Sequence, residues 1–144
     1  MSLTPVSFVI LWLIGGVGVA IFDLIWIVFV MKSVYKEHLG HLLSTKSDSS
    51  LDPSIASAIT VWAILAWGMM VFVIPRISTT NVIGGGLLWG SLWGFTVHAL
   101  YDITNVATLK NWPILITVMD ILWGSFKCAV VTVFVALIAM QFFQ

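Results

Sequence analysis

The sequence predicts an all-α membrane protein, a four-transmembrane-helix bundle, in a single domain that covers residues 1–144. Of the 144 residues, 60% are hydrophobic and 8% are charged, whereas a soluble domain has roughly 45–50% apolar and about 25% charged residues. The apolar residues also occur in long blocks, and four blocks reach the roughly 20 residues that a helix needs to cross a bilayer. A soluble globular fold is therefore excluded.

Helix-breaking residues mark the ends of these blocks. Pro53, Pro75 and Pro113 lie at block boundaries, as expected for a residue that cannot donate a backbone hydrogen bond inside a helix. No Lys or Arg precedes the first block, which is longer than the apolar region of a signal peptide, so we expect a permanent helix. The predicted spans are about residues 6–31, 55–74, 82–100 and 114–142.

The link between the first two spans is long, and the other two links are short. It begins with Tyr35, Leu39 and Leu43 at helical spacing and then becomes rich in Ser, Asp and Pro, which indicates a short helical continuation followed by a loop. The link also carries His38 and His41, three residues apart. Two loop histidines without further ligands are usually solvated, so we expect no metal site.

The distribution of positive charge predicts the orientation. An even number of spans puts both termini on one face, where Arg76 is the only Lys or Arg. The positive-inside rule places the more positive face in the cytoplasm and both termini outside it. Because no presequence precedes the first span, we expect a bacterial inner membrane. The opposite face carries four lysines, Lys32, Lys36, Lys46 and Lys110.

Charge and motifs exclude several function classes. Six Lys+Arg balance six Asp+Glu, and a net charge of +0 gives no basic surface for a nucleic-acid partner. No nucleotide-binding loop, serine-hydrolase elbow or zinc-protease motif is present, so we expect no cofactor and no standard hydrolase or phosphotransfer mechanism. The single cysteine, Cys128, is expected to pack as a small apolar residue.

Five ionisable residues fall in or near the predicted spans, where charge is costly and usually faces the bundle interior. At ~1.5 Å of rise per residue, Asp23 lies about 12 Å from the end of its span, and Asp120 lies about 10 Å from the start of its own. The topology brings both to one depth in the cytoplasmic half. Two such carboxylates repel, so we expect one to be protonated or neutralised by Lys127 or His98. The fifth residue is Asp102.

The polar residues of the third span have two interpretations. His98, Asp102 and Asn105 share one side of the helix, with Tyr101 in the same run, so they extend the predicted polar cluster. Alternatively, Asp102 and Asn105 cap backbone donors at the helix end and the hydroxyls of Thr104 and Thr108 bond back to the helix. In this interpretation Tyr101 and Trp112 anchor the chain at the membrane interface.

Each of the two acids at matching depth is followed by tryptophan three residues later, as Asp23…Trp26 and Asp120…Trp123. Because the two helices run in opposite directions, the pair indicates an inverted repeat around a central site. In the structural alternative, each indole packs over its acid and donates to a nearby acceptor. Lys127 likewise has a structural interpretation, an ion pair with Asp23.

Glycines at spacing four leave one face of the third helix smooth. Gly86, Gly90 and Gly94 predict close packing against a neighbouring helix, with a slot for a lipid tail or small ligand as the alternative. The glycines within residues 15–18 are the expected packing partner.

Two groups of residues are similar to those of a known family. The first is the string YDITNVATLKNWP at residues 101–113, followed by Asp120, Trp123 and Gly124. The second is the opening set Asp23, Trp26, Tyr35, Leu39 and Gly40. Together they resemble the predicted membrane-protein family called domain of unknown function 2177, over most of the chain. The resemblance implies four spans and a chain of about this length, and it implies no established activity or cofactor.

The leading hypothesis is a small binding or transport protein with a polar pocket open to the cytoplasmic side. Its ligand would be a cation, a proton-coupled solute or a lipid head group, its surroundings membrane lipid, and transport would need a homo-oligomer. The alternatives are an accessory subunit of a membrane complex and, third, an intramembrane enzyme acting on a lipid or isoprenoid. A non-enzyme is favoured, and no catalytic residue is assigned. The predicted ligand-binding residues are Asp23, Trp26, His98, Tyr101, Asp102, Asn105, Asp120, Trp123 and Lys127.

Overall fold

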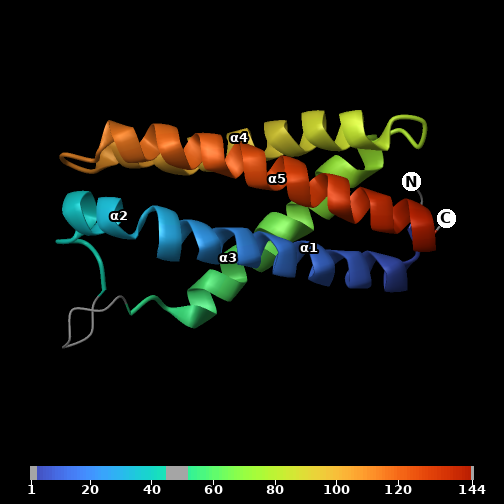
Figure 1. Cartoon of the computed structure of the whole chain (residues 1–144), viewed down its shortest axis with the longest axis horizontal. Helices are drawn as coiled ribbons and strands as arrows, with labels where there is room; N and C mark the ends of the chain where they lie inside the picture. Colours follow the sequence, from blue (N-terminus) through green and yellow to red (C-terminus); the bar gives the residue numbers. More distant parts are fainter. Residues whose placement is uncertain (1–2, 45–51, 144) are drawn as a thin grey trace.

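The protein is a bundle of long helices without strands in the part of the chain that the structure describes, residues 3–44 and 52–143 of a computed structural model (Figure 1). The two ends of the chain lie together at one end of the bundle, and α2 and the α4–α5 link lie at the other. Lys46, which entered the predicted orientation, is outside the described residues. The elements are α1 (Pro5–Ile25), η1 (Trp26–Val30), α2 (Lys32–Leu39), α3 (Ile55–Gly68), η2 (Met69–Val73), η3 (Ile74–Arg76), α4 (Val82–Thr108) and α5 (Ile114–Phe142).

The helix starts follow from local side-chain chemistry. Thr4, Ser54 and Asn81 each precede a helix, and each side-chain oxygen accepts the backbone N–H three residues further on. At its other end α4 continues to Thr108, beyond the predicted boundary at residue 100. The apolar block ends at that boundary, but the hydroxyls of Thr104 and Thr108 donate back to carbonyls four residues earlier and leave the helix intact.

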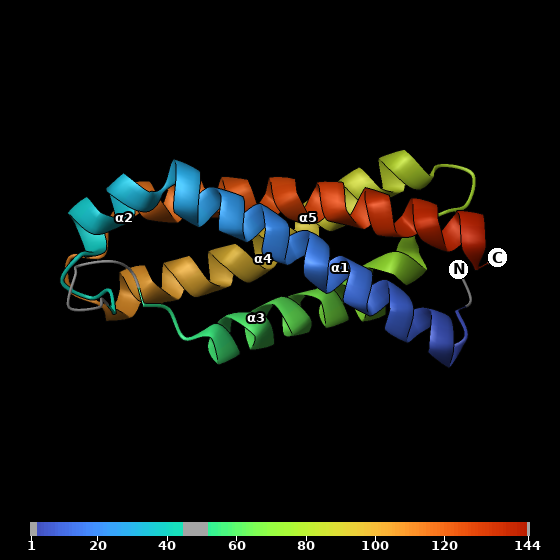
Figure 2. The same ribbon diagram turned by 60° about the horizontal axis from the view of Figure 1, so that its bottom comes forward.

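Three helical segments of the described chain are long and apolar enough to cross a membrane, Pro5–Val30, Ile55–Arg76 and Ile114–Phe142. The fourth predicted span, in α4, is not among them. It is 27 residues long, but glycines and polar residues dilute its apolar content. Since α4 packs along α5 (Figures 1 and 2), the fold is an all-α membrane bundle, and the crossing of α4 stays a prediction.

Three glycines of α4, Gly86, Gly90 and Gly94, face α5. A Cβ atom on Gly94 would lie 2.2 Å from the carbonyl oxygen of Gly124, and a Cβ on Gly90 would lie 2.7 Å from the carbonyl oxygen of Cys128. The two backbones therefore approach closely, and α4 and α5 form the most extensive helix pair. The expected partner was wrong, because Gly15 on α1 faces the Met69 side chain instead.

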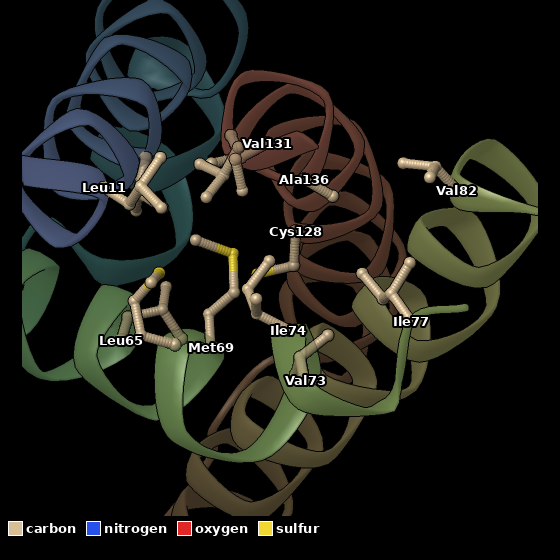
Figure 3. Close-up of a cluster of buried hydrophobic side chains, with 14 residues drawn as sticks. Leu11, Leu65, Met69, Val73, Ile74, Ile77, Val82, Cys128, Val131 and Ala136 are labelled. Atoms are coloured by element: carbon tan, nitrogen blue, oxygen red, sulfur yellow. The ribbon is translucent and has the colours of Figure 1, made fainter. Parts of the chain in front are cut away.

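Two apolar clusters pack the two ends of the bundle. The larger joins α1, η2, η3 and α5 in the half nearest the chain ends, around residues such as Leu11, Met69 and Val131 (Figure 3). The smaller holds α2 against α5 through Met31, Leu39 and Ile116. Between the clusters α3 runs obliquely to the other helices (Figure 1), so its first half is not packed along α4 or α5.

The predicted first span is not one continuous α-helix. It changes to a π-helical turn at Trp26–Val30 and ends at a bend at Met31, whose N–H donates to the carbonyl of Trp26. A second π-helical turn, Met69–Val73, follows Gly68 on α3. Apolar periodicity does not report such turns, which occur frequently at functional sites.

Candidate functional site

A cavity of about 570 Å³ lies in the half of the bundle nearest α2. Its walls are largely aromatic and aliphatic, with contributions from α3, α4 and α5 such as Leu65, Trp93 and Trp123. Its polar lining residues come from α1, α2, α4 and α5, and are Asp23, Tyr35, His98, Tyr101, Asp102, Asp120 and Lys127. Residues far apart in the sequence thus surround one space.

Asp23 on α1 forms an ion pair with Lys127 on α5. The same carboxylate accepts a hydrogen bond of 3.0 Å from the indole N–H of Trp62 on α3. Lys127 is 3% exposed, so the pair is shielded from water. The two formal charges cancel, and the contacts tie three helices together.

Asp120 on α5 has neutral partners. Its Oδ1 atom accepts 2.7 Å from the Tyr35 hydroxyl and 3.0 Å from the Trp26 indole N–H. Burial and the Asp120 carboxylate raise the pKa of Tyr35 above its usual range, so the phenol keeps the proton that it donates. Within the described residues no cation pairs with Asp120.

Asp23 and Asp120 were expected to repel each other, and in the structure each has partners of its own. Of the two predicted solutions, protonation of one acid or neutralisation, the geometry supplies neutralisation of Asp23 by Lys127. The two tryptophans also differ, because Trp26 crosses over to Asp120 while the ring of Trp123 stacks on Trp26 at 4.4 Å and 8°. The Trp123 indole N–H is buried and has no acceptor among the described residues.

His98 lies on α4 against the backbone of α5. Its Nδ1 atom is 2.8 Å from the carbonyl oxygen of Gly94, so this nitrogen carries the hydrogen and donates it. A Cβ on Gly124 would lie 2.2 Å from the imidazole. The ring therefore depends on Gly124 for its space beside the cavity.

Asp102 does not form the predicted helix cap. Its side chain is 0% exposed, and neither carboxylate oxygen has a hydrogen-bond partner among the described residues. The side-chain amide nitrogen of Asn105 also has no partner there. The hydroxyls of Thr104 and Thr108 donate back to carbonyls of α4, which confirms that part of the structural interpretation, but the capping role of Asp102 was wrong.

The structure brings together all predicted site residues except one. Asn105 is not among the cavity-lining residues, and Tyr101 lines the rim with 61% of its surface exposed. The ring of Tyr101 meets Trp112 edge-on at 6.4 Å. The cluster is therefore narrower than predicted at the end of α4.

Sequence reasoning missed two donors to the acids, Tyr35 and Trp62. Tyr35 carried a signal, since its link begins at helical spacing, and from α2 its hydroxyl donates to Asp120. Trp62 carried none, because one tryptophan in an apolar block is indistinguishable from a lipid-facing one. The same holds for Trp93, which lines the cavity and donates to the carbonyl of Leu65 at 3.3 Å.

No group of three or more His, Cys, Asp or Glu side chains is placed to hold a metal ion within residues 3–44 and 52–143. His38 and His41 are exposed at the α2 end, away from the cavity.

Together these features define a small helical-bundle membrane protein. The family model described as predicted membrane protein (DUF2177) matches residues 8–137, and the chain belongs to this family. Comparison with curated proteins and with solved structures found no match to the chain.

Proposed function

We propose that this protein is a small membrane binding or transport protein whose ligand occupies the cavity. The observation that carries the proposal is the combination of an apolar cavity with two carboxylates, Asp102 and Asp120, that have no paired cation within residues 3–44 and 52–143. A volume of about 570 Å³ falls within the roughly 300–1,000 Å³ typical of small-molecule sites. Apolar walls with a few polar groups are also characteristic of such sites.

The state of Asp102 supports a ligand over a purely structural role. A buried carboxylate without hydrogen-bond partners is costly inside a membrane protein, and buried polar groups are normally satisfied. A ligand that bonds to Asp102 would remove this cost. A carboxylate retained only for packing would be expected to have a protein partner, as Asp23 does.

The rim of the cavity suggests how an apolar ligand would enter. Val61 and Ile64 on α3 are 58% and 62% exposed, and Trp67 is 48% exposed; all three line the cavity. In a bilayer these side chains would face lipid tails, so entry from the side is favoured. The opening toward the cytoplasm stays a prediction.

The accessory-subunit hypothesis has one specific observation in its favour. Asp23, Lys127 and Trp62 satisfy one another without a ligand and join three helices, as a structural network would. This network occupies one wall of the cavity and leaves Asp120 and Asp102 unexplained. We therefore rank the accessory role second.

A variant that fills the cavity tests the proposal. Val97 is half-buried on α4 and lines the cavity, so Val97→Phe reduces its volume. Val106→Phe places the same ring at an exposed position of the same helix and serves as the control. Both variants and the wild type would be extracted directly from membranes in polymer-bounded discs, and bound molecules would be identified by mass spectrometry.

We expect the wild type and Val106→Phe to retain a small molecule or a specific lipid that Val97→Phe has lost. Equal retention by all three proteins would mean that the molecule binds the outer surface. The absence of any retained molecule from the wild type would also contradict the proposal, and the accessory role would then be preferred.

We also propose a bacterial inner membrane location with the α2 end of the bundle in the cytoplasm. Lys32, Lys36 and Lys110 lie at that end, and Arg76 lies at the end of the bundle where the chain termini meet (Figure 1). This asymmetry supports the orientation through the positive-inside rule. Transport, as opposed to binding, would require a homodimer, because four helices form a thin wall for a pore.

Cysteine labelling in intact cells tests the orientation. In a Cys128→Ala background, Ser33→Cys reports the α2 end and Ser78→Cys reports the end with the termini. We expect a membrane-impermeant maleimide to label Ser78→Cys alone. Labelling of Ser33→Cys alone would reverse the orientation.

A further inference from the structure

The hydrogen-bond donors next to Asp23 and Asp120 already donate to these two acids. The Lys127 ammonium and the Trp62 indole donate to Asp23. The Tyr35 hydroxyl and the Trp26 indole N–H donate to Asp120. A ligand that needs these four donors would have to break their contacts with the acids.

The free groups of the cavity are mostly acceptors. Both oxygens of Asp102 are without partners within the described chain, in a side chain that is 0% exposed and lines the cavity. Asp120 makes both of its hydrogen bonds through Oδ1, so the second oxygen accepts none among the described residues. Of the buried donors on the described lining residues, the Trp123 indole N–H has no acceptor, and the Tyr101 hydroxyl at the exposed rim is a further donor. Two acids of the lining thus have three oxygen atoms without a hydrogen-bond donor among the described residues.

The charged groups of the cavity show a similar imbalance, with acids but no cations left unpaired among the described residues. The Lys127 ammonium already forms an ion pair with Asp23. The Nδ1–H group of His98 donates to the Gly94 carbonyl of its own helix. Two carboxylates, Asp102 and Asp120, line the cavity without a paired cation in the described residues. A cationic ligand would give these two acids the partner that Lys127 gives to Asp23.

From these observations we infer that the ligand is an organic cation, an ammonium group carried on an apolar body. Its N–H groups supply the donors that Asp102 and the second oxygen of Asp120 lack, and charge-assisted bonds of this kind are the strong ones. The inference rests on the proposed function and names its ligand class.

The walls of the cavity fit such a molecule. Trp26, Trp93 and Trp123 line it, and tryptophan is the best aromatic partner for a cation within about 6 Å of its ring. The aliphatic lining residues of α3 accommodate an alkyl or ring body. An anionic head group is disfavoured, because it would meet the acids Asp102 and Asp120, which have no paired cation among the described residues.

A matched series of eight-carbon probes tests the charge and the donors separately. Octylammonium has both, octyltrimethylammonium has the charge without N–H groups, octanol is a neutral donor and octyl sulfate is an anion. The protein would be placed in phosphatidylcholine nanodiscs, and each probe would be titrated while tryptophan fluorescence and the melting temperature are recorded.

We expect saturable binding of octylammonium with a rise in melting temperature, weaker binding of octyltrimethylammonium, and no saturable effect of octyl sulfate. Asp102→Asn should weaken octylammonium binding about tenfold or more, since one charge-assisted bond is lost. The control is Asp52→Asn, the same chemical change at an exposed position, which should leave binding unchanged. Asp120→Asn provides a second variant and should also weaken octylammonium binding.

Three results would overturn the inference: equal affinity for octanol and octylammonium, preference for octyl sulfate, or unchanged octylammonium binding in both acid variants. The source of the ammonium group is a separate outcome. If phosphatidylethanolamine in the nanodisc blocks octylammonium in the wild type but not in Asp102→Asn, the ligand is an aminolipid head group. Without blocking, it is a free amine.

The two proposals can fail separately. If the probes show no ammonium preference while Val97→Phe still abolishes retention of a molecule, the binding function stands and the ligand class is wrong. If Val97→Phe has no effect on retention and the probes do not bind, both proposals fail.

Discussion

Asp23 and Asp120 stand at the same place in two copies of one local pattern, an acid followed by tryptophan three residues later. Their surroundings differ in charge. Asp23 has an ammonium and an indole as partners, whereas Asp120 has a phenol and an indole. The first acid has a cationic partner within the protein, and the second has only neutral hydrogen-bond donors among the described residues.

This difference teaches that the local pattern sets where an acid sits and the packing of other helices sets its role. The ammonium of Lys127 lies seven residues after Asp120 on the same helix, but it reaches across to Asp23. The bend at Met31 brings Tyr35 to Asp120. Asp23 consequently resembles a structural element, and Asp120 resembles part of a site that awaits a partner.

The largest expected effect comes from leaving Asp23 without its cation. Lys127→Met keeps the length of the side chain and removes the charge, so we expect a loss of about 3–5 kcal/mol of stability, the usual result of breaking a buried ion pair on one side. The measurement is unfolding in detergent by heat and by dodecyl sulfate. In the double variant Asp23→Asn/Lys127→Met most of the loss should be recovered; additive losses would mean that the ion pair is not the source.

Substitution of Trp26 should cost more stability than substitution of Trp123, because, of these two, only the Trp26 indole N–H donates a hydrogen bond among the described residues. Trp26→Phe removes a donor to the charged Asp120, and we expect a loss of about 2 kcal/mol, as for hydrogen bonds to charged groups. Trp123→Phe keeps an aromatic ring in the stack and loses no hydrogen bond, so its cost should be under about 1 kcal/mol. Equilibrium unfolding of both variants checks this order, and a reversed order would break the comparison.

Tyr35→Phe removes the other donor to Asp120 and should cost about 1.5 kcal/mol near neutral pH. Because the folded pKa of Tyr35 is raised above the ordinary 10.0, its contribution is complete below pH 10 and is lost as the pH rises beyond that value. The stability difference between the wild type and Tyr35→Phe, measured from pH 7 to pH 11, should be constant and then decline. A difference that grows with pH would contradict the assignment of the proton to Tyr35.

The smallest effect is expected for Asp120→Asn, within about 1 kcal/mol of the wild type. The amide oxygen can still accept from both donors, and the loss of charge-assisted strength is offset by removal of an unpaired charge. The same unfolding measurements apply. If Asp120→Asn is as destabilised as Lys127→Met, Asp120 is also structural, and the comparison on which the site rests is lost.

Much of this fold could be predicted from the sequence, because apolar blocks, prolines and links report helices directly. The predicted first and last spans differ from their helical segments by a residue or so at either end. The helix α4 extends beyond the predicted apolar span, as expected from the placement of Tyr101, Asp102 and Asn105 on one helix, and threonine hydroxyls bond to carbonyls in this extension.

The site was predictable in its acids but not in their donors. Burial of charge in an apolar chain is rare, so Asp23 and Asp120 stand out in the sequence. Trp62 does not stand out among the eight tryptophans. The pairing of the α4 glycines with α5 also depends on which helices are neighbours, and that is decided by the whole bundle.

The geometry of the site depends on the number of residues in the π-helical turn at Trp26–Val30, whatever their side chains. An α-helix advances by about 100° per residue, so deleting one residue from this turn would rotate everything beyond it by about that angle. Asp23, on the earlier side, would keep its position, while Tyr35 would swing away from Asp120. The number of residues in this turn thus sets the rotational position of Tyr35 relative to Asp23. An insertion or deletion there would leave the bundle able to form but would remove the Tyr35 donor from Asp120.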